Sequence, residues 1–271
     1  MPENGCEATF KTSDGCTIAY TLEAGHRRDA PRMALIHPLG LDRSVWDGVV
    51  RRFAGEVETL AYDCRGHGHS GREAGEFTLE LFARDLAELL DHVGWRKAAV
   101  VGCSMGGCVA LAFAGLHTER VSALGLVNTT SWYGEEGPRQ WKERAENARR
   151  QGLASLTEFQ LTRWLSDDFR ATHPEKAEWA RRVFLANSLD CYAATCLMLG
   201  PADLRPYLAK LHMPTAIIAG EEDYATPVTE SRQLHEAIAG STLTILPKAR
   251  HVTPVECKAD VAAILAELAR R

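Results

Sequence analysis

Short runs of almost continuously apolar residues recur along this chain, and longer amphipathic stretches separate them. A strand covered on both faces loses the usual alternation of apolar and polar residues, so such runs are typical of a parallel sheet. Six of them stand at residues 33–37, 59–63, 98–102, 124–128, 215–220 and 242–246. Two earlier strand-like runs, 10–12 and 17–22, flank an Asp-Gly pair, which predicts a hairpin. Together they predict a mostly parallel sheet of eight strands.

The stretches between these runs have helical periodicity. Apolar residues at Leu79, Phe82, Leu86 and Leu90 share one helix face, and Gly94 stands where a glycine commonly ends a helix. Three further helices are predicted over residues 104–117, 227–239 and 258–269. Alternating strands and helices predict an α/β fold in which helices flank the sheet through right-handed crossovers.

The segment of about residues 131–206 has a helical pattern and no convincing strand, and it holds four of the six tryptophans. A helical insertion between two strands of a parallel sheet lies at one end of that sheet, where it can cover a site. We therefore expect a core domain of residues 1–130 and 207–271, with residues 131–206 forming a helical lid. The charged stretch 139–150 within it is interpreted as a solvent-facing helix surface.

Length and composition exclude several classes. A chain of 271 residues with 45% hydrophobic residues can build one large core that carries an insertion. The net charge of -5 disfavours a nucleic-acid partner, which needs a basic face. Eight scattered cysteines in a chain of this length favour free thiols in a reducing cytoplasm. Residues 1–6 lack the pattern of a signal peptide, and no apolar run reaches the ~20 residues that span a bilayer.

The strongest local motif is Gly-x-Ser-x-Gly at residues 102–106, which follows a predicted strand and begins a predicted helix. In this context the serine stands on a strained turn with its hydroxyl exposed, so Ser104 is the candidate nucleophile. The backbone N–H of Met105, at the start of the helix, can stabilise an oxyanion. A second donor is expected from the loop after residues 33–37. Pro38 has no N–H, so we predict that Leu39 supplies it.

A serine hydroxyl becomes a good nucleophile only when a base takes its proton. Most of the ten histidines stand at surface or helix-end positions. His37 ends a strand, and His67 and His69 lie in a glycine-rich loop, where we expect them to organise loops rather than to hold a metal. His251 alone combines a loop after a strand with a position far downstream of Ser104. It is the predicted base.

The predicted acid is Asp223, which follows a strand and would fix the imidazole tautomer and stabilise the imidazolium. Glu221 and Glu222 are rivals within two residues. The other common place for the acid follows the preceding strand, and there the chain has Asn128, which cannot carry the charge. The order serine, aspartate, histidine is the one expected for an α/β-hydrolase.

The motifs of this chain and their order along the sequence closely resemble those of the α/β-hydrolase superfamily, and the resemblance spans nearly the whole chain. The residues that carry the resemblance are His37-Pro38-Leu39-Gly40, Asp63-x-Arg65-Gly66-His67-Gly68-x-Ser70, Gly102-x-Ser104-Met105-Gly106-Gly107, Gly220-x-x-Asp223 and His251. More narrowly, Arg163-Trp164, Phe169-Arg170 and Asp203-Leu204-Arg205-Pro206 look like the 3-oxoadipate enol-lactonases of aromatic catabolism. The resemblance implies a serine hydrolase without a cofactor, acting on a small lactone or ester.

One loop departs from the enol-lactonase pattern, because His37-Pro38 stands where that group has Asn-Ser. The loop looks more like that of general esterases, so a general carboxylesterase and a carbon–carbon bond hydrolase of aromatic degradation stay open. A non-catalytic ligand-binding protein of the same fold is the alternative from another class. An enol-lactone carries a carboxylate, for which Arg163 is the candidate partner. Trp132 and Trp164 are further candidate substrate contacts.

Overall fold

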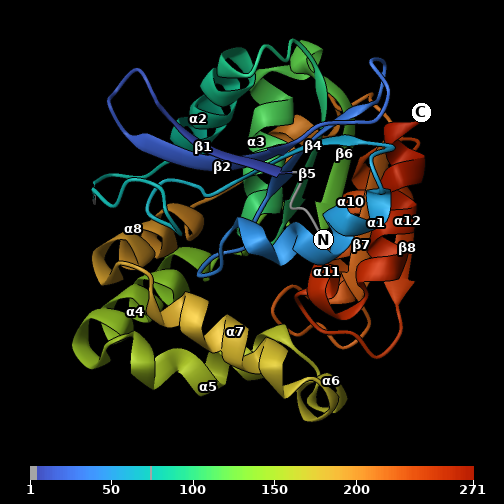
Figure 1. The fold of residues 1–271 in the computed structure, drawn as a ribbon. Coiled ribbons are helices and arrows are strands. Elements are labelled where there is room, and N and C mark those ends of the chain that lie inside the picture. Colours follow the sequence, from blue (N-terminus) through green and yellow to red (C-terminus); the bar gives the residue numbers. More distant parts are fainter. Residues whose placement is uncertain (1–4, 74) are drawn as a thin grey trace.

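The computed structural model describes residues 5–73 and 75–271, and eight strands within them form one sheet (Figure 1). The strands are β1 (Gly5–Lys11), β2 (Thr17–Glu23), β3 (Arg32–Ile36), β4 (Glu58–Tyr62), β5 (Ala98–Cys103), β6 (Val121–Val127), β7 (Thr215–Gly220) and β8 (Thr242–Leu246). Their order in the sheet is β1-β2-β4-β3-β5-β6-β7-β8. The pairs β1–β2 and β2–β4 are antiparallel, and all other pairs are parallel. The predicted hairpin and mostly parallel sheet are confirmed.

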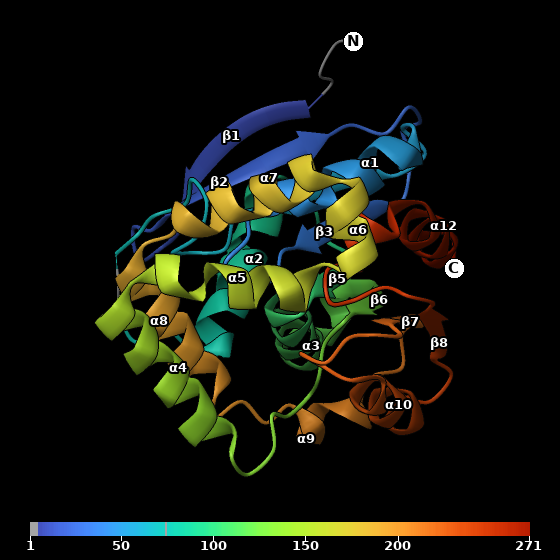
Figure 2. The ribbon, with the colours of Figure 1, turned by 90° about the horizontal axis from the view of Figure 1, so that it is seen from below.

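Helices cover both faces of this sheet (Figure 2). On one side lie α2 (Leu79–His92), α3 (Met105–Leu116) and α10 (Val228–Ala237), and on the other lie α1 (Asp47–Phe53) and α12 (Lys258–Ala269). Every residue of β5 and of β7 is buried as a result, which is why these strands have continuous apolar runs. Four short helical turns accompany the sheet and its flanking helices: η1 (Arg43–Trp46), η2 (Thr118–Arg120), α9 (Arg205–Leu208) and α11 (Thr253–Glu256).

Five of the helices between β6 and β7, those that precede α9, form a group: α4 (Gly137–Gln151), α5 (Leu153–Trp164), α6 (Asp167–Thr172), α7 (Pro174–Leu185) and α8 (Leu189–Leu199). They form a separate layer below the sheet in Figure 1, with α4 packed on α8 and α5 on α7. The helical pattern predicted within residues 131–206 is therefore present. Hereafter these five helices are called the helical insert.

Ser104 follows β5, Asp223 follows β7 and His251 follows β8. Because these strands are parallel, their carboxyl ends meet at one edge of the sheet, so residues far apart in the chain gather there.

All eight cysteines are free. No helix in the described part of the chain is both long enough and apolar enough to cross a membrane. The expectation about a signal peptide concerned residues 1–6, of which residues 1–4 lie outside the described residues.

Candidate active site

The turn between β5 and α3 holds Ser104 in a strained backbone conformation, with φ 54° and ψ -117°. A non-glycine residue in such a region costs about 1–3 kcal/mol and is concentrated at functional sites. The turn also needs small neighbours. A Cβ on Gly102 would lie 1.9 Å from the Gly106 carbonyl oxygen, and one on Gly106 would lie 2.3 Å from that of Ile36. The glycine spacing of the motif is therefore a steric requirement of this tight turn.

Ser104, His251 and Asp223 form an unbroken chain of hydrogen bonds. His251 Nε2 lies 2.8 Å from Ser104 Oγ, and His251 Nδ1 lies 2.8 Å from Asp223 Oδ2. Both His251 and Asp223 are buried, while the serine is partly exposed. Since the carboxylate accepts the Nδ1 proton, Nε2 is left free to accept the proton of the serine hydroxyl. We refer to these three residues as the triad.

The carboxylate of Asp223 is surrounded by donors. Its Oδ2 also accepts hydrogen bonds from Asn128 Nδ2 and Thr226 Oγ1, both at 2.9 Å. Its Oδ1 accepts from the backbone N–H groups of Ala225 at 2.8 Å and Thr226 at 3.1 Å. Burial alone would raise the pKa of Asp223, but the charge of His251 and these hydrogen bonds hold it below its ordinary value. Asn128, which cannot carry a negative charge, instead helps to orient the Asp223 carboxylate.

The two rival carboxylates point elsewhere. Glu221 accepts a hydrogen bond from the backbone N–H of Lys248 at 3.1 Å. Glu222 lies 3.9 Å from the Arg250 guanidinium, and nearly half of its side chain is exposed. The Nδ1 position of His251 is bonded to Asp223 instead. The geometry therefore distinguishes three acids that the sequence leaves side by side.

The two backbone N–H groups predicted to stabilise an oxyanion belong to Met105 and Leu39. Met105 is the first residue of α3, where a helix leaves its N–H groups without intrahelical partners. Leu39 lies in the loop after β3 and lines the same cavity as Ser104. Within residues 5–73 and 75–271, neither N–H donates to another group of the chain. Both N–H groups are therefore free to donate, as the predicted oxyanion donors must be.

The side chain of His37 braces the loop that carries Leu39. His37 Nδ1 lies 2.8 Å from the carbonyl oxygen of Pro38, and Nε2 lies 2.9 Å from the backbone nitrogen of Cys64. The Cys64 N–H can only donate, so the neutral ring with its proton on Nδ1 satisfies both contacts. In a trans peptide the C=O and N–H point in opposite directions. The Pro38 C=O and the Leu39 N–H belong to one peptide group. Because the Pro38 oxygen points toward the His37 ring, the Leu39 N–H points away from that ring.

His37 and His67 are both buried, with ring centroids 5.0 Å apart. Burial lowers the pKa of His37 to about 4 and that of His67 to about 3, from an ordinary value of 6.5. The unfolded chain therefore binds protons on these rings below about pH 6.5, whereas the folded chain stays neutral there. Binding of protons to the unfolded state alone favours unfolding. The fold should thus lose stability as the pH falls from 6.5 toward 4.

We expect the free energy of unfolding in urea to fall by about 2 kcal/mol per buried histidine between pH 7 and pH 5. His67→Phe, which keeps a ring against His37, should remove about half of this dependence. His212→Phe alters an exposed histidine and serves as the control, since it should leave the dependence unchanged. An equally steep dependence in His67→Phe would contradict the assignment.

A small cavity of about 20 Å³ lies against Ser104, enough for about one water molecule. Its walls include the triad histidine and residues of the helical insert, among them Arg163 and Trp164. Trp132 is absent from these walls. It pairs with Asp203 in an isolated bridge, and the Arg205 guanidinium lies 3.7 Å from its ring centroid. Of the three predicted substrate contacts, the structure brings two to the serine.

Arg144 corrects the interpretation of residues 139–150 as wholly solvent-facing. It lines the cavity, its Nε donates to the Tyr192 hydroxyl at 2.8 Å, and its guanidinium lies 4.8 Å from the Trp141 ring centroid. The buried residues Ala145 and Ala148 mark the inner face of α4. Arg144 adjoins that face, and this periodicity was the available signal for its inward position.

Arg163 also reaches the cavity, with its guanidinium 5.0 Å from the Phe159 ring centroid and 5.8 Å from that of Tyr224. Burial and the nearby charge of Arg144 lower the pKa of Arg163, but an arginine stays charged at neutral pH. Among the described residues, neither arginine forms an ion pair with a carboxylate. The cavity at the serine is therefore positively charged.

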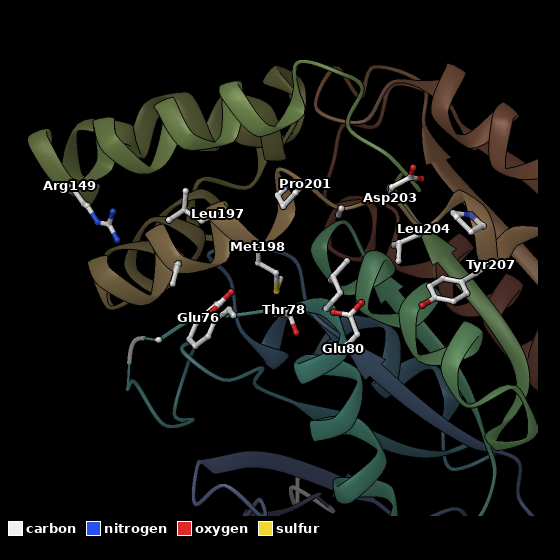
Figure 3. A pocket seen from close by; sticks show the side chains of 16 residues that line it. Glu76, Thr78, Glu80, Arg149, Leu197, Met198, Pro201, Asp203, Leu204 and Tyr207 are labelled. Carbon is white, nitrogen blue, oxygen red and sulfur yellow. The ribbon is translucent and has the colours of Figure 1, made fainter.

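A larger cavity of about 660 Å³ lies away from the serine (Figure 3). Thr78 and Glu80 at the start of α2 face Met198 of α8 and Tyr207 of α9 across it. No residue of the triad lines it. The smaller cavity is therefore the candidate active site, because Ser104 and His251 line it, although the other cavity has the larger volume.

Comparison with known proteins gives consistent results. Residues 31–256 match the family described as alpha/beta hydrolase fold. The chain is 33% identical over 239 residues to 3-oxoadipate enol-lactonase 2 of Acinetobacter baylyi, covering 88% of each chain. The crystal structure of the enol-lactonase from Burkholderia xenovorans LB400 superposes with a TM-score of 0.92 at 30% identity, over 97% of this chain and 100% of that one. The structure of a malate-bound thermophilic esterase from Thermogutta terrifontis superposes with a TM-score of 0.88 at 28% identity, over 99% of this chain and 98% of that one.

Proposed function

This chain belongs to the alpha/beta hydrolase fold family, and we propose that it is a serine hydrolase that cleaves a lactone or carboxylic ester through an acyl-enzyme. The observation that carries this proposal is the hydrogen-bonded series Ser104–His251–Asp223, with 2.8 Å at each link. The hydrolases among its relatives support the broader class.

In the proposed mechanism His251 takes the Ser104 proton while Oγ attacks the carbonyl carbon of the substrate. The Leu39 and Met105 N–H groups stabilise the resulting oxyanion, and Asp223 stabilises the imidazolium. Collapse of the tetrahedral intermediate expels an alcohol or enolate, which takes the proton from the imidazolium. Water then gives a proton to His251 and attacks the acyl-enzyme, and the serine leaves with that proton. Groups of this chain perform every step, so the proposal requires no cofactor.

The substrate we favour carries a carboxylate, as an enol-lactone such as that of 3-oxoadipate does. Arg163, without a carboxylate partner among the described residues, is its proposed partner, and Arg144 adds a second positive charge. The enol-lactonase relatives and the malate in the esterase structure support an anionic ligand. The His37-Pro38 loop, which looks like that of general esterases, favours the alternative of a general carboxylesterase.

The helical insert is proposed to act as a lid. A cavity of about 20 Å³ cannot hold a lactone of several heavy atoms. Movement of the walls that the insert supplies would make room for a substrate, as the movement of lids does in many enzymes. We assign residues 131–206 to this lid and residues 1–130 and 207–271 to the core domain.

The test of the substrate class compares kcat/KM for 3-oxoadipate enol-lactone with that for neutral p-nitrophenyl esters. Arg163→Gln should lower kcat/KM for the charged lactone by about 10- to 100-fold, since a hydrogen bond to a charged group contributes about 1.5–3 kcal/mol. The neutral esters should change little. Arg182→Gln, an exposed arginine of α7, is the matched control and should affect neither substrate. Equal losses on both substrates would instead favour the general carboxylesterase.

A further inference from the structure

The buried amide of Gln160 carries an oxygen that has no hydrogen-bond partner within residues 5–73 and 75–271. Gln160 stands on α5, is only 1% exposed and lines the cavity at Ser104. Its Nε2 donates to the Tyr192 hydroxyl at 2.8 Å, which leaves Oε1 as the unsatisfied atom. A buried acceptor without a donor costs about 1–3 kcal/mol. In a substrate cavity, such an atom indicates that the ligand supplies the missing donor.

The contacts of Tyr192 determine which end of the amide is free. Arg144 Nε can only donate, and it bonds the same hydroxyl at 2.8 Å. Burial raises the pKa of Tyr192 to about 12, so the hydroxyl stays protonated at neutral pH. The hydroxyl oxygen accepts from both Arg144 Nε and Gln160 Nε2. Gln160 therefore presents its NH₂ group to Tyr192 and keeps its oxygen for another partner.

The chemistry of the walls selects one kind of ligand group. Arg144 and Gln160 line the same cavity, and its volume of about 20 Å³ is small enough for one group to reach both. A carboxylate or carbonyl oxygen would satisfy the guanidinium but offers no hydrogen to Oε1, while an N–H group offers nothing to the guanidinium. A hydroxyl group donates to Oε1 and accepts from the arginine.

We propose that Gln160 and Arg144 form a subsite for a hydroxyl group of the substrate. This inference rests on the hydrolase function proposed above and adds a preference, among lactones and esters that carry a carboxylate, for those that also carry a hydroxyl group. Arg163 remains available for the carboxylate of the same molecule, because its guanidinium lies against Phe159 and Tyr224 rather than against Tyr192.

The first test uses the p-nitrophenyl half-esters of glutarate, 2-hydroxyglutarate and 3-hydroxyglutarate, which differ only in the hydroxyl. The unmodified protein should hydrolyse at least one hydroxylated ester with a kcat/KM about tenfold above that of the plain ester. In Gln160→Met, which keeps the volume but removes the amide, this ratio should fall to about one. Thr157→Val is the matched control and should keep the ratio, because Thr157 is similarly buried on α5 but bonds the Leu153 carbonyl.

The second test does not depend on turnover. Dissociation constants of glutarate and of the two hydroxyglutarates are measured by calorimetry on Ser104→Ala, alone and combined with Gln160→Met. A hydroxylated acid should bind Ser104→Ala about tenfold more tightly than glutarate, and the added Gln160→Met should remove the difference. Equal affinities in Ser104→Ala, or a preference that survives Gln160→Met, would overturn the subsite. Persistent hydrolysis by Ser104→Ala would overturn the proposed function instead, so the two failures are distinguishable.

Discussion

Ser104→Ala should lower kcat/KM for p-nitrophenyl acetate by at least about 10⁴-fold and abolish covalent labelling by a fluorophosphonate. The side chain is the only hydroxyl bonded to His251 Nε2 within the described residues. The neighbouring thiol of Cys103 cannot replace it, because it is buried, lies 3.8 Å from the His251 carbonyl oxygen, and has a pKa that burial holds well above its ordinary value. Hydrolysis is followed by release of p-nitrophenolate and labelling by the mass of the intact protein.

The matched control for this variant is Ser155→Ala, at an exposed position of the helical insert, which should keep both hydrolysis and labelling. Ser104→Ala removes only the hydroxyl and leaves the glycine contacts of the turn unchanged, so the variant should unfold at nearly the same temperature as the unmodified protein. Retention of either hydrolysis or labelling by folded Ser104→Ala would exclude Ser104 as the nucleophile.

Asp223→Asn is expected to lower kcat by about 10⁴-fold with little change in KM. An asparagine can keep one oxygen for the Ala225 and Thr226 N–H groups, but its NH₂ group then faces His251 Nδ1 and Asn128 Nδ2, which are themselves donors. The imidazole is therefore driven to the tautomer with its proton on Nε2, and Ser104 loses its base. The charge that stabilised the imidazolium is lost as well.

Two identical carboxylate-to-amide changes nearby provide the controls. Glu221 accepts a hydrogen bond from the Lys248 N–H, and Glu222 lies near Arg250, so neither side chain contacts His251. Glu221→Gln and Glu222→Gln should therefore each keep their activity within about twofold of the unmodified protein. Steady-state rates on one activated ester, measured for all three variants, complete the comparison. An active Asp223→Asn together with an inactive Glu222→Gln would assign the acid to Glu222.

The sheet could be predicted because a strand that is buried on both faces has a continuous run of apolar residues in the sequence. Strands β5 and β7 are buried at every position, so their apolar runs stand out without any knowledge of their neighbours. The serine turn is equally readable, since Gly102 and Gly106 are required by contacts within a few residues or with the adjacent β3 strand. Helix α1 could not be predicted in this way, because its seven residues are too few to show a helical period.

The walls of the cavity could not be predicted in the same way. Periodicity distinguishes an inner from an outer helix face, but Arg144 lies at the border of the two, where its charge favours a solvent-facing interpretation. The aromatic ring of Trp132 and its place within residues 131–206 predict a pocket position, yet it packs with Asp203 and Arg205. Each outcome depends on how one element meets another that is distant in the chain.

The sequence by itself determined the parallel sheet, the strained serine turn and the order of serine, acid and base, because each is encoded by local sterics or by burial of a single element. Only the tertiary structure decided which of three adjacent acids meets His251 and which polar side chains surround the serine. The bond of Asp223 to His251 spans 28 residues, and that of Gln160 to Tyr192 spans 32. Such contacts depend on the packing of whole elements, and no local pattern of residues records them.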